Sequence, residues 1–562
     1  MGADQSRPSD DDSVNEKLIQ RLQALNMKDE KYFRERDEYV VIGEEEARMS
    51  CLVLSCPALP CPALPCLPLP PSNHPPSSPI HAPRQVPGKC LHQVGCPVGG
   101  GAHGRPKGKR PRPPPARPLR RLTVCQNRLA LSALSTNPAS AVLSSRATVI
   151  ADTHRFNIKI PTEGSPVTNQ ASSGRCWLFA STNVFRIAIM KRYKLSDFQL
   201  SQAYLFYWDK MEKANYFLES ILDTKHDEID SRIVQALMAS PVGDGGQWDM
   251  VANLVQKYGL VPHSLYPDSY NASNSSIMDR LITTKLREDA VRLRAIASTP
   301  MSPEAMKATL ASEKEKMLRE IHLILTLMLG PPPSAAKPFT WEYYDKDGRL
   351  STVRSTPIEF ASELSEHRVV RALSGTDVHT LFSLVNDPRN PYNRLLSVKR
   401  LGNVWNGRPV TYVNVDMKTI KEACIAMLKR GMPVFFGSDV GKYSDSSKGI
   451  MDTELFDYEL GFNIKLGLTK AERLQTGESQ MTHAMVLTAV HVVDGKPVRW
   501  RVENSWSDRV GDKGYFVMSD AWMDEFVYQA VVDPSVVSSS VRKVLEQQPK
   551  MLELWDPMGA LA

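Results

Sequence analysis

Two hydrophobic patterns occur along the chain. Apolar residues recur near helical spacing in 13–47, 176–194 and 277–330, which predicts helices there. From about residue 410 the pattern changes to short apolar runs, including 410–415 and 433–436, which are typical of strands. This order predicts an α+β protein with a helical half, a helical middle region and a β-rich half.

A β-hairpin is predicted within the β-rich half. Residues 482–493 form a long, mostly apolar run, and residues 498–506 form a second run of strand character. Asp494 and Gly495 stand between the two runs, and an Asp-Gly pair is a strong signal for a two-residue hairpin turn. The two runs are therefore expected to pair as antiparallel neighbours.

The expected register of this hairpin brings three functional side chains together. A two-residue loop places His483 opposite Trp506, and Asn504 opposite Met485. Because residues two apart on a strand share a face, His483, Asn504 and Trp506 are expected on one face. An imidazole oriented by an amide is a candidate base for an activated nucleophile. The alternative for His483 is a half-buried core histidine.

Cys176 is the candidate nucleophile. It begins the helix predicted at 176–194, where the helix dipole favours a thiolate over a thiol. Thiolate attack on a carbonyl creates an oxyanion, to which Gln170 and the backbone N–H of Cys176 are candidate donors. A lone cysteine at a helix start is more often structural, and the candidate base at His483 is what favours a catalytic role.

Paired glycines mark a second candidate region. Gly245 and Gly246 carry no side chain that would block the approach of an extended substrate backbone. The alternative is a simple turn.

The net positive charge of the chain comes from one segment. Residues 51–150 contain no Asp or Glu and 12 Lys or Arg, and the rest of the chain has 57 basic and 62 acidic residues. Within this segment, residues 51–124 are rich in Pro, Cys and Arg, and such composition rarely forms a packed core. We expect a disordered insertion. Its cysteine spacing fits no usual zinc site, and its basic residues leave weak nucleic-acid binding open.

The candidate site residues belong to motifs that resemble the papain superfamily. The matching motifs are Gln170-x5-Cys176-Trp, Thr482-His-Ala-Met and Glu503-Asn-Ser-Trp. The residues Ser-Gly-Arg before the cysteine and the 307-residue gap from cysteine to histidine differ from the secreted papain types. Both features, with Asp244-Gly-Gly-Gln-Trp and the ending Trp555-Asp-Pro-Met-Gly-Ala-Leu-Ala, are similar to the intracellular bleomycin hydrolase branch. Ser507 stands where that family commonly has glycine.

This resemblance implies a fold and a set of roles. The fold is papain-like, with a helical insertion domain and a C-terminal arm in the cleft. Cys176 is the nucleophile, His483 the base, Asn504 its orienter, Gln170 the oxyanion donor and Trp506 a shield, while Gly245, Gly246 and Ala562 bind substrate. The activity implied is an aminopeptidase without metal or cofactor that also acts on bleomycin and homocysteine thiolactone. The implied assembly is a homohexamer.

Six regions are expected from the patterns and the resemblance together. They are 1–50, an N-terminal extension and helix; 51–124, the insertion; 125–275, the helical half; 276–400, the helical insertion domain; 401–545, the β-rich half; and 546–562, the C-terminal arm.

Two other functions compete with this interpretation. One is a nucleic-acid-binding protein, suggested by the net charge of +7, and the other is a catalytically inactive scaffold of the same fold. The start Met1-Gly2-Ala-Asp-Gln-Ser6 matches a loose N-myristoylation pattern, which would give a membrane contact through Gly2. We expect a cytoplasmic protein, and the sequence leaves a mitochondrial pool open.

Overall fold

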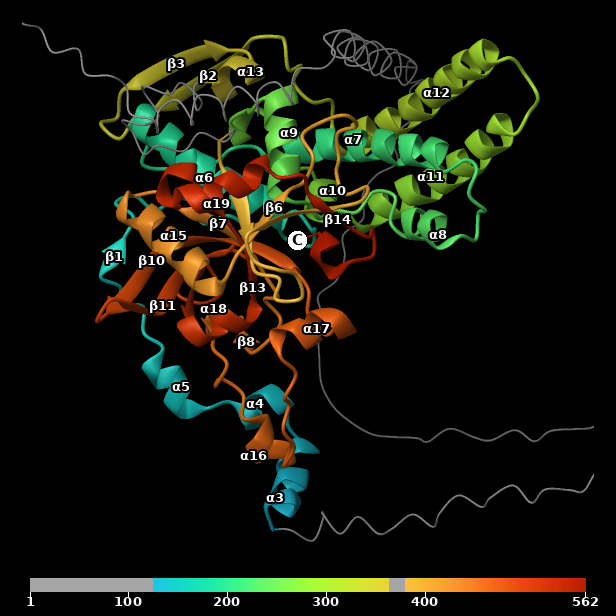
Figure 1. Ribbon diagram of the computed structural model, residues 1–562. Helices are drawn as coiled ribbons and strands as arrows, with labels where there is room; N and C mark the ends of the chain where they lie inside the picture. Colours follow the sequence, from blue (N-terminus) through green and yellow to red (C-terminus); the bar gives the residue numbers. More distant parts are fainter. Residues whose placement is uncertain (1–124, 363–379, 562) are drawn as a thin grey trace, which may run out of the picture.

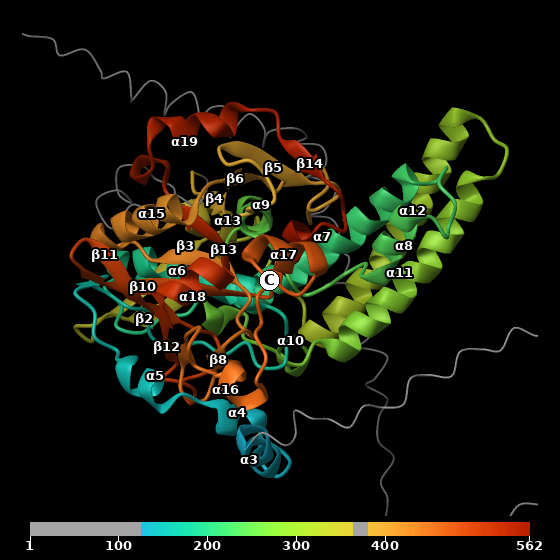
Figure 2. The same ribbon diagram turned by 60° about the horizontal axis from the view of Figure 1, so that its bottom comes forward.

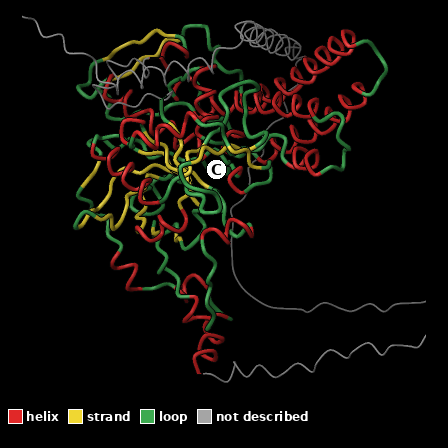
Figure 3. Tube along the Cα trace, viewed as in Figure 1, coloured by secondary structure: helices red, strands yellow, loops and turns green. Residues whose placement is uncertain are grey.

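The computed structural model describes residues 125–362 and 380–561. Helices and strands mix throughout this part of the chain, which confirms the predicted α+β class (Figure 3). Four features predicted from the sequence lie outside the described residues: the helix at 13–47, the insertion at 51–124, Gly2 and Ala562.

One sheet organises the described residues. Twelve strands belong to it, in the order β14-β5-β6-β4-β13-β7-β10-β11-β12-β9-β8, and β1 pairs with β10 at its side. The strands are β1 (Ile158–Lys159), β4 (Phe382–Val385), β5 (Arg394–Val398), β6 (Tyr412–Asn414), β7 (Val434–Ser438), β8 (Ser444–Asp445), β9 (Ile450–Met451), β10 (His483–Val493), β11 (Lys496–Glu503), β12 (Tyr515–Ser519), β13 (Val527–Val532) and β14 (Lys550–Leu552).

Helices cover both faces of this sheet near β10 (Figure 1). Val486 belongs to the apolar cluster that includes α6 (Cys176–Arg192), and Leu487 belongs to the cluster that includes α15 (Met417–Lys429). Because successive strand residues point to opposite faces, α6 and α15 lie on opposite sides of β10. A strand buried on both faces explains why residues 482–493 are mostly apolar rather than alternating.

The predicted helical zone at 277–330 consists of two helices. They are α11 (Ser276–Ala297) and α12 (Pro303–Leu329), which extend together away from the sheet (Figure 2). Ser302 caps α12 by accepting the backbone N–H of Ala305, and Gly330 ends it with a φ of +85°. The long helix α7 (Gln202–Asp223) packs against both and connects this pair to the core.

The expectation of a helical domain over 276–400 is wrong after α12. A two-stranded hairpin follows, β2 (Phe339–Tyr344) with β3 (Leu350–Ser355), and then the short helix α13 (Pro357–Ser362). β4 and β5 then join the main sheet, where β4 pairs with β6 and β13. These partners come later in the chain, so no local pattern in 276–400 could indicate the pairing.

The other helices surround this framework. They are α3 (Cys125–Leu134), α4 (Ala139–Leu143), α5 (Arg146–Ala151), α8 (Arg232–Ala239), α9 (Trp248–Tyr258), α10 (Tyr270–Ser273), α16 (Tyr458–Phe462), α17 (Lys470–Thr476), α18 (Asp520–Phe526) and α19 (Ser539–Lys543). Short 3-10 turns lie at His263–Leu265, Pro534–Val536, Val544–Glu546 and Pro557–Gly559.

The hairpin predicted from Asp494-Gly495 is confirmed. Val493 pairs with Lys496 across the turn, and Asp494 and Gly495 have φ angles of +49° and +77°, as a tight hairpin turn of this kind requires. Two irregularities in the ladder compensate for each other, so that Val486 still pairs with Glu503, as the two-residue loop predicts. The strand β11 ends there, immediately before Asn504.

Candidate active site

Cys176 occupies the first position of the buried helix α6. Its side chain is 2% exposed, and α6 packs against β10. Burial raises the pKa of the Cys176 thiol to about 11, while backbone hydrogen bonds from Ala484, Trp177 and Cys176 itself oppose that rise. Since Ala484 follows His483 directly, the thiol lies beside the start of the strand that carries the candidate base.

His483 and Asn504 form the hydrogen bond expected of a base and its orienter. The imidazole Nε2 lies 2.8 Å from Asn504 Oδ1. The backbone N–H of Ser505 also donates to Oδ1 at 2.8 Å, which identifies that atom as the amide oxygen. Because this oxygen can only accept, Nε2 carries the proton and Nδ1 remains available to accept a proton from a thiol.

Trp506 packs against the imidazole of His483. Its ring centroid lies 4.7 Å from that of His483, with 31° between the planes, and it also contacts the ring of Phe516 at 5.9 Å. Trp506 pairs with Asn169 through an isolated bridge and lies beyond the end of β11. His483 and Trp506 therefore meet as the sequence predicts, although the backbone partner of Trp506 is the loop before Cys176.

Gln170 is fixed to the same loop. Its backbone N–H donates to the Ser505 carbonyl at 2.9 Å, and its Oε1 accepts from the Ser505 hydroxyl at 2.7 Å. Its Nε2 donates to the Ser173 carbonyl at 2.7 Å, which leaves one further N–H on that amide. The Ser505 contacts orient Gln170 relative to Asn504, and nothing in the sequence pattern singled out Ser505.

The glycine pair lies against the helix that begins with Cys176. A Cβ on Gly246 would lie 2.4–2.5 Å from ring atoms of Trp177, so only glycine permits this approach. The Trp177 indole N–H donates to the Asp244 carbonyl at 2.7 Å, and Lys213 donates to the Gly245 carbonyl at 2.7 Å. The segment is thus tied to α6 on one side and to α7 on the other.

A buried charge network stabilises this segment. Lys210 Nζ lies 2.6 Å from carboxylate oxygens of both Asp244 and Asp279. Asp244 also accepts the backbone N–H of Gly174 at 2.7 Å and the Ser275 hydroxyl at 2.5 Å. The carboxylate therefore links the loop before the nucleophile to α11, a connection that no single motif revealed.

The last part of the C-terminal arm, residues 553–561, follows β14 and is held by contacts at several points. Asp556 pairs with Arg389 at 2.7 Å, and the Met558 carbonyl accepts from the Tyr412 hydroxyl at 3.2 Å. The Met558 side chain is buried in the core, and Gln247 donates to the Ala560 carbonyl at 2.6 Å. The arm thus reaches the residue that follows Gly246, and it includes a 3-10 turn at Pro557–Gly559 instead of an extended chain throughout.

Ser507 adopts a conformation that explains the glycine common in the resembling family. Its φ is +67°, in the left-handed region that favours glycine. Its backbone N–H donates to the Thr168 carbonyl at 3.1 Å, so the loop after Trp506 keeps its contact with the segment before Gln170.

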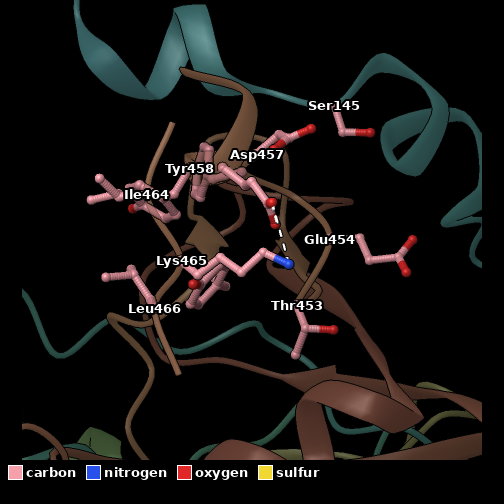
Figure 4. Close-up of a pocket in the computed structure, with 11 residues that line it drawn as sticks. Ser145, Thr453, Glu454, Asp457, Tyr458, Ile464, Lys465 and Leu466 are labelled. Carbon is pink, nitrogen blue, oxygen red and sulfur yellow. Dashed lines mark ion pairs between the residues drawn. The ribbon is translucent and has the colours of Figure 1, made fainter. Parts of the chain in front are cut away.

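A separate pocket of about 440 Å³ is shown in Figure 4. Its walls come from α16 and adjoining segments, and Lys465 pairs with Glu459 across it at 3.4 Å. None of the candidate catalytic side chains lines it. Among the described residues there is no cluster of three or more His, Cys, Asp or Glu that could hold a metal ion. The described helices likewise include none that is long and apolar enough to cross a membrane.

The fold and the site together define a papain-like cysteine peptidase. The chain belongs to the Peptidase C1-like family, whose model matches residues 122–559. It is 43% identical over 434 residues to the mitochondrial cysteine proteinase 1 of Saccharomyces cerevisiae strain JAY291, covering 76% of this chain and 87% of that protein.

Human bleomycin hydrolase is 43% identical over 426 residues, covering 74% of this chain and 90% of that protein. The crystal structure of PepW from Lactobacillus rhamnosis HN001 matches with a TM-score of 0.73 and 43% identity, covering 78% of this chain and 96% of that chain. The resemblance to bleomycin hydrolases inferred from the motifs is therefore confirmed.

A buried ion pair supports the base-bearing loop, and its removal should be costly. Arg186 on α6 lies 2.5 Å from Glu503, which precedes Asn504, and both side chains are almost fully buried. Burial raises the pKa of Glu503, and Arg186 opposes that rise. We expect Arg186→Met to lower the free energy of unfolding by about 3–5 kcal/mol, because it leaves a buried carboxylate without its partner.

The same change should make stability depend on pH. Without Arg186 the folded-state pKa of Glu503 rises further above its unfolded value, so stability is retained at low pH and lost as pH rises through the folded pKa. Urea unfolding at pH 5.5 and pH 8 measures this, with Arg186→Lys as the control that keeps a positive charge. An equal loss at both pH values would contradict the ion-pair interpretation.

Proposed function

We propose that the chain is a cysteine aminopeptidase of bleomycin hydrolase type. It removes residues from the free N-termini of peptides, and the amide of bleomycin and homocysteine thiolactone are further candidate substrates. The observation that supports restriction to chain ends is the C-terminal arm, which the Gln247–Ala560 hydrogen bond ties to the segment beside Cys176. An obstacle there would leave no room for a substrate whose chain extends further on the N-terminal side of the cleaved bond.

The proposed chemistry is acyl transfer through a thioester. In the resting enzyme the proton of Cys176 has passed to His483 Nδ1. The Cys176 thiolate attacks the amide carbonyl, and the carbonyl oxygen becomes an oxyanion that Gln170 and the Cys176 N–H stabilise. The C–N bond breaks as His483 returns the proton to the leaving amine. Water, deprotonated by His483, then attacks the thioester and releases the acid and the thiol.

The resting protonation state depends on the pair and not on either group alone. Burial lowers the pKa of His483 to about 4, although its hydrogen bond to Asn504 acts in the opposite direction, and burial raises the pKa of Cys176 to about 11. Each group alone therefore resists ionisation at pH 7. The expected thiolate–imidazolium pair forms only because proton transfer creates two opposite charges side by side, whose attraction offsets both desolvation costs.

The pH dependence of alkylation tests this pairing. In the intact enzyme, we expect the rate of iodoacetamide reaction at Cys176 to be nearly constant between about pH 5 and 9, since the thiolate is present throughout as part of the pair. In His483→Ala no proton acceptor remains. A thiol with a pKa of about 11 is ionised to only about 10⁻⁴ at pH 7. The alkylation rate of the variant at pH 7 should therefore be far below that of the intact enzyme, and it should increase as the pH is raised. Identical profiles in both proteins would exclude the pair.

Cleavage of peptide pairs that differ only in N-acetylation tests the proposed aminopeptidase function. The free-amine peptides should be cut at their N-terminal end, and the acetylated peptides should be cut far more slowly. Mass spectrometry of the products identifies each bond. If acetylated peptides are cut at internal bonds as fast as free ones, the chain is an endopeptidase and the proposal is wrong.

We expect a homohexamer, which light scattering coupled to size-exclusion chromatography would measure. We expect a cytoplasmic protein, and a mitochondrial pool is suggested by the name of the yeast relative. Intact mass of the native protein would reveal both acylation at Gly2 and the presence of residues 51–124.

A further inference from the structure

The last part of the C-terminal arm depends on one side chain. Up to Gly559 the arm is held by several contacts, including the Arg389–Asp556 pair and the burial of Met558. Beyond Gly559, the hydrogen bond from Gln247 Nε2 to the Ala560 carbonyl is the last one in the described residues that joins the arm to the body of the protein. The hydrogen bond from Gln247 therefore fixes the position of the end of the arm.

The environment of Gln247 indicates that holding the arm is its principal role. The residue is 1% exposed and precedes α9, but its side chain does not cap that helix. Its Oε1 is buried without a hydrogen-bond partner among the described residues, so the arm is the only described partner of the amide. Burying an amide costs free energy unless it is hydrogen-bonded. The side chain of Gln247 makes no hydrogen bond that stabilises α9.

The contact lies close to the nucleophile along a short chain of neighbours. Gln247 follows Gly246, whose backbone lies directly against the ring of Trp177. Trp177 follows Cys176 and is fixed by its indole hydrogen bond to the Asp244 carbonyl. A shift of the arm at Ala560 would therefore change the space next to the glycine pair without touching the base or the orienting amide.

We propose that Gln247 is a positioning residue that sets the N-terminal selectivity of the enzyme by holding the end of the arm beside the glycine pair. This inference rests on the proposed aminopeptidase function. Gln247 acts through the arm. Its loss frees the tip of the arm and admits substrates whose chain extends further on the N-terminal side of the cleaved bond.

Two replacements separate the hydrogen bond from the packing. Gln247→Met keeps a similar volume without a donor, and Gln247→Glu keeps the shape but places a carboxylate oxygen against the Ala560 carbonyl. In each variant we expect the ratio of kcat/KM for N-acetylated over free-amine peptides to rise by about tenfold or more, the factor that loss of one buried hydrogen bond allows. KM for the free peptide should rise by a larger factor than kcat falls, because binding of the chain end is disturbed and the chemistry is not.

Asn253 provides a matched control on the same helix. It is a buried amide of α9 that donates to the Arg408 carbonyl at 3.0 Å and accepts the Arg408 backbone N–H at 2.8 Å, with no hydrogen bond to the arm. Asn253→Ala should lower the melting temperature and leave the selectivity ratio unchanged. A rise in the ratio for Asn253→Ala equal to that for Gln247→Met would show that general loosening of α9 is responsible, and would overturn the proposal.

A double-mutant cycle tests whether Gln247 acts through the arm. In an enzyme lacking residues 560–562, Gln247→Met should produce no further change in the ratio, because its partner is already absent. Additive effects would overturn the proposal. If the intact enzyme is selective and both Gln247 variants remain equally selective, the proposal is wrong while the aminopeptidase function stands. If the intact enzyme itself cuts acetylated peptides as fast as free ones, the proposed function fails first.

Discussion

Replacing Cys176 by alanine is expected to reduce amide hydrolysis by about 10⁵-fold or more, which is the scale of loss when a nucleophile that acts in one unit with its base is removed. The fold should be retained, because the change removes one sulfur atom from the start of α6 and no hydrogen bond of the base depends on it. The measurement is the rate of peptide hydrolysis at saturating enzyme, together with the melting temperature.

Cys424 is the matched control for this experiment. It is a free, fully buried cysteine on α15, and burial raises its pKa to about 12, so it resembles Cys176 in chemistry. Among the described residues no ionisable side chain contributes to its pKa. Cys424→Ala should leave hydrolysis unchanged, and limiting iodoacetamide should label Cys176 alone. Substantial turnover in Cys176→Ala would show that another group is the nucleophile.

The partners of Cys176 should rank by their distance from the chemistry. His483→Ala is expected to be about as damaging as Cys176→Ala, because proton transfer needs both groups. Asn504→Ala should be milder, since Asn504 touches only Nε2 of the imidazole and orients it. A loss in Asn504→Ala as large as in His483→Ala would mean that the amide does more than fix the tautomer.

The elements that sequence predicted well are those whose signals are local. The Asp494-Gly495 turn fixes the register of β10 against β11, and this register brings His483 to Asn504. The second helix of the 277–330 zone, α12, has its own capping residues, and the nucleophile begins a helix whose apolar positions are visible in the sequence. For the hairpin and for α12 the sequence itself contains the turn or the cap that ends the element.

The contacts that sequence missed join residues that are far apart in the chain. Arg186 meets Glu503 across 317 positions, and Gln247 meets Ala560 across 313. β4 and β5 are short runs whose membership of the main sheet depends on partners after residue 410. An isolated arginine or glutamine gives no indication of its partner, because burial and pairing are decided by tertiary packing.

The C-terminal arm should act as the device that restricts the enzyme to N-terminal residues. We expect the end of the arm to lie where the N-terminus of a substrate binds. An N-acetylated peptide should be cut slowly because its acetyl group would meet the arm.

The position of Met558 decides where the arm should be cut. Removing residues 558–562 would take away a side chain that is 1% exposed in the core and would reduce stability as well as selectivity. Removing only 560–562 keeps Met558 and its carbonyl bond to Tyr412, so the fold of the arm's base is preserved. The shorter deletion is therefore the cleaner test, and the longer one serves as its comparison for stability.

The enzyme without residues 560–562 is expected to cut N-acetylated peptides at internal bonds, with kcat/KM at least about tenfold higher than the intact enzyme on the same peptides. Its Cys176 should react with iodoacetamide at the original rate, because no atom of the nucleophile, base or orienting amide has been removed. On free-amine peptides KM should rise, since the end of the arm no longer contacts the substrate N-terminus, and cleavage sites should spread inward from the N-terminus. Mass spectrometry of the products resolves each bond. Unchanged cleavage sites and equally slow cleavage of acetylated peptides would show that another part of the chain excludes blocked N-termini.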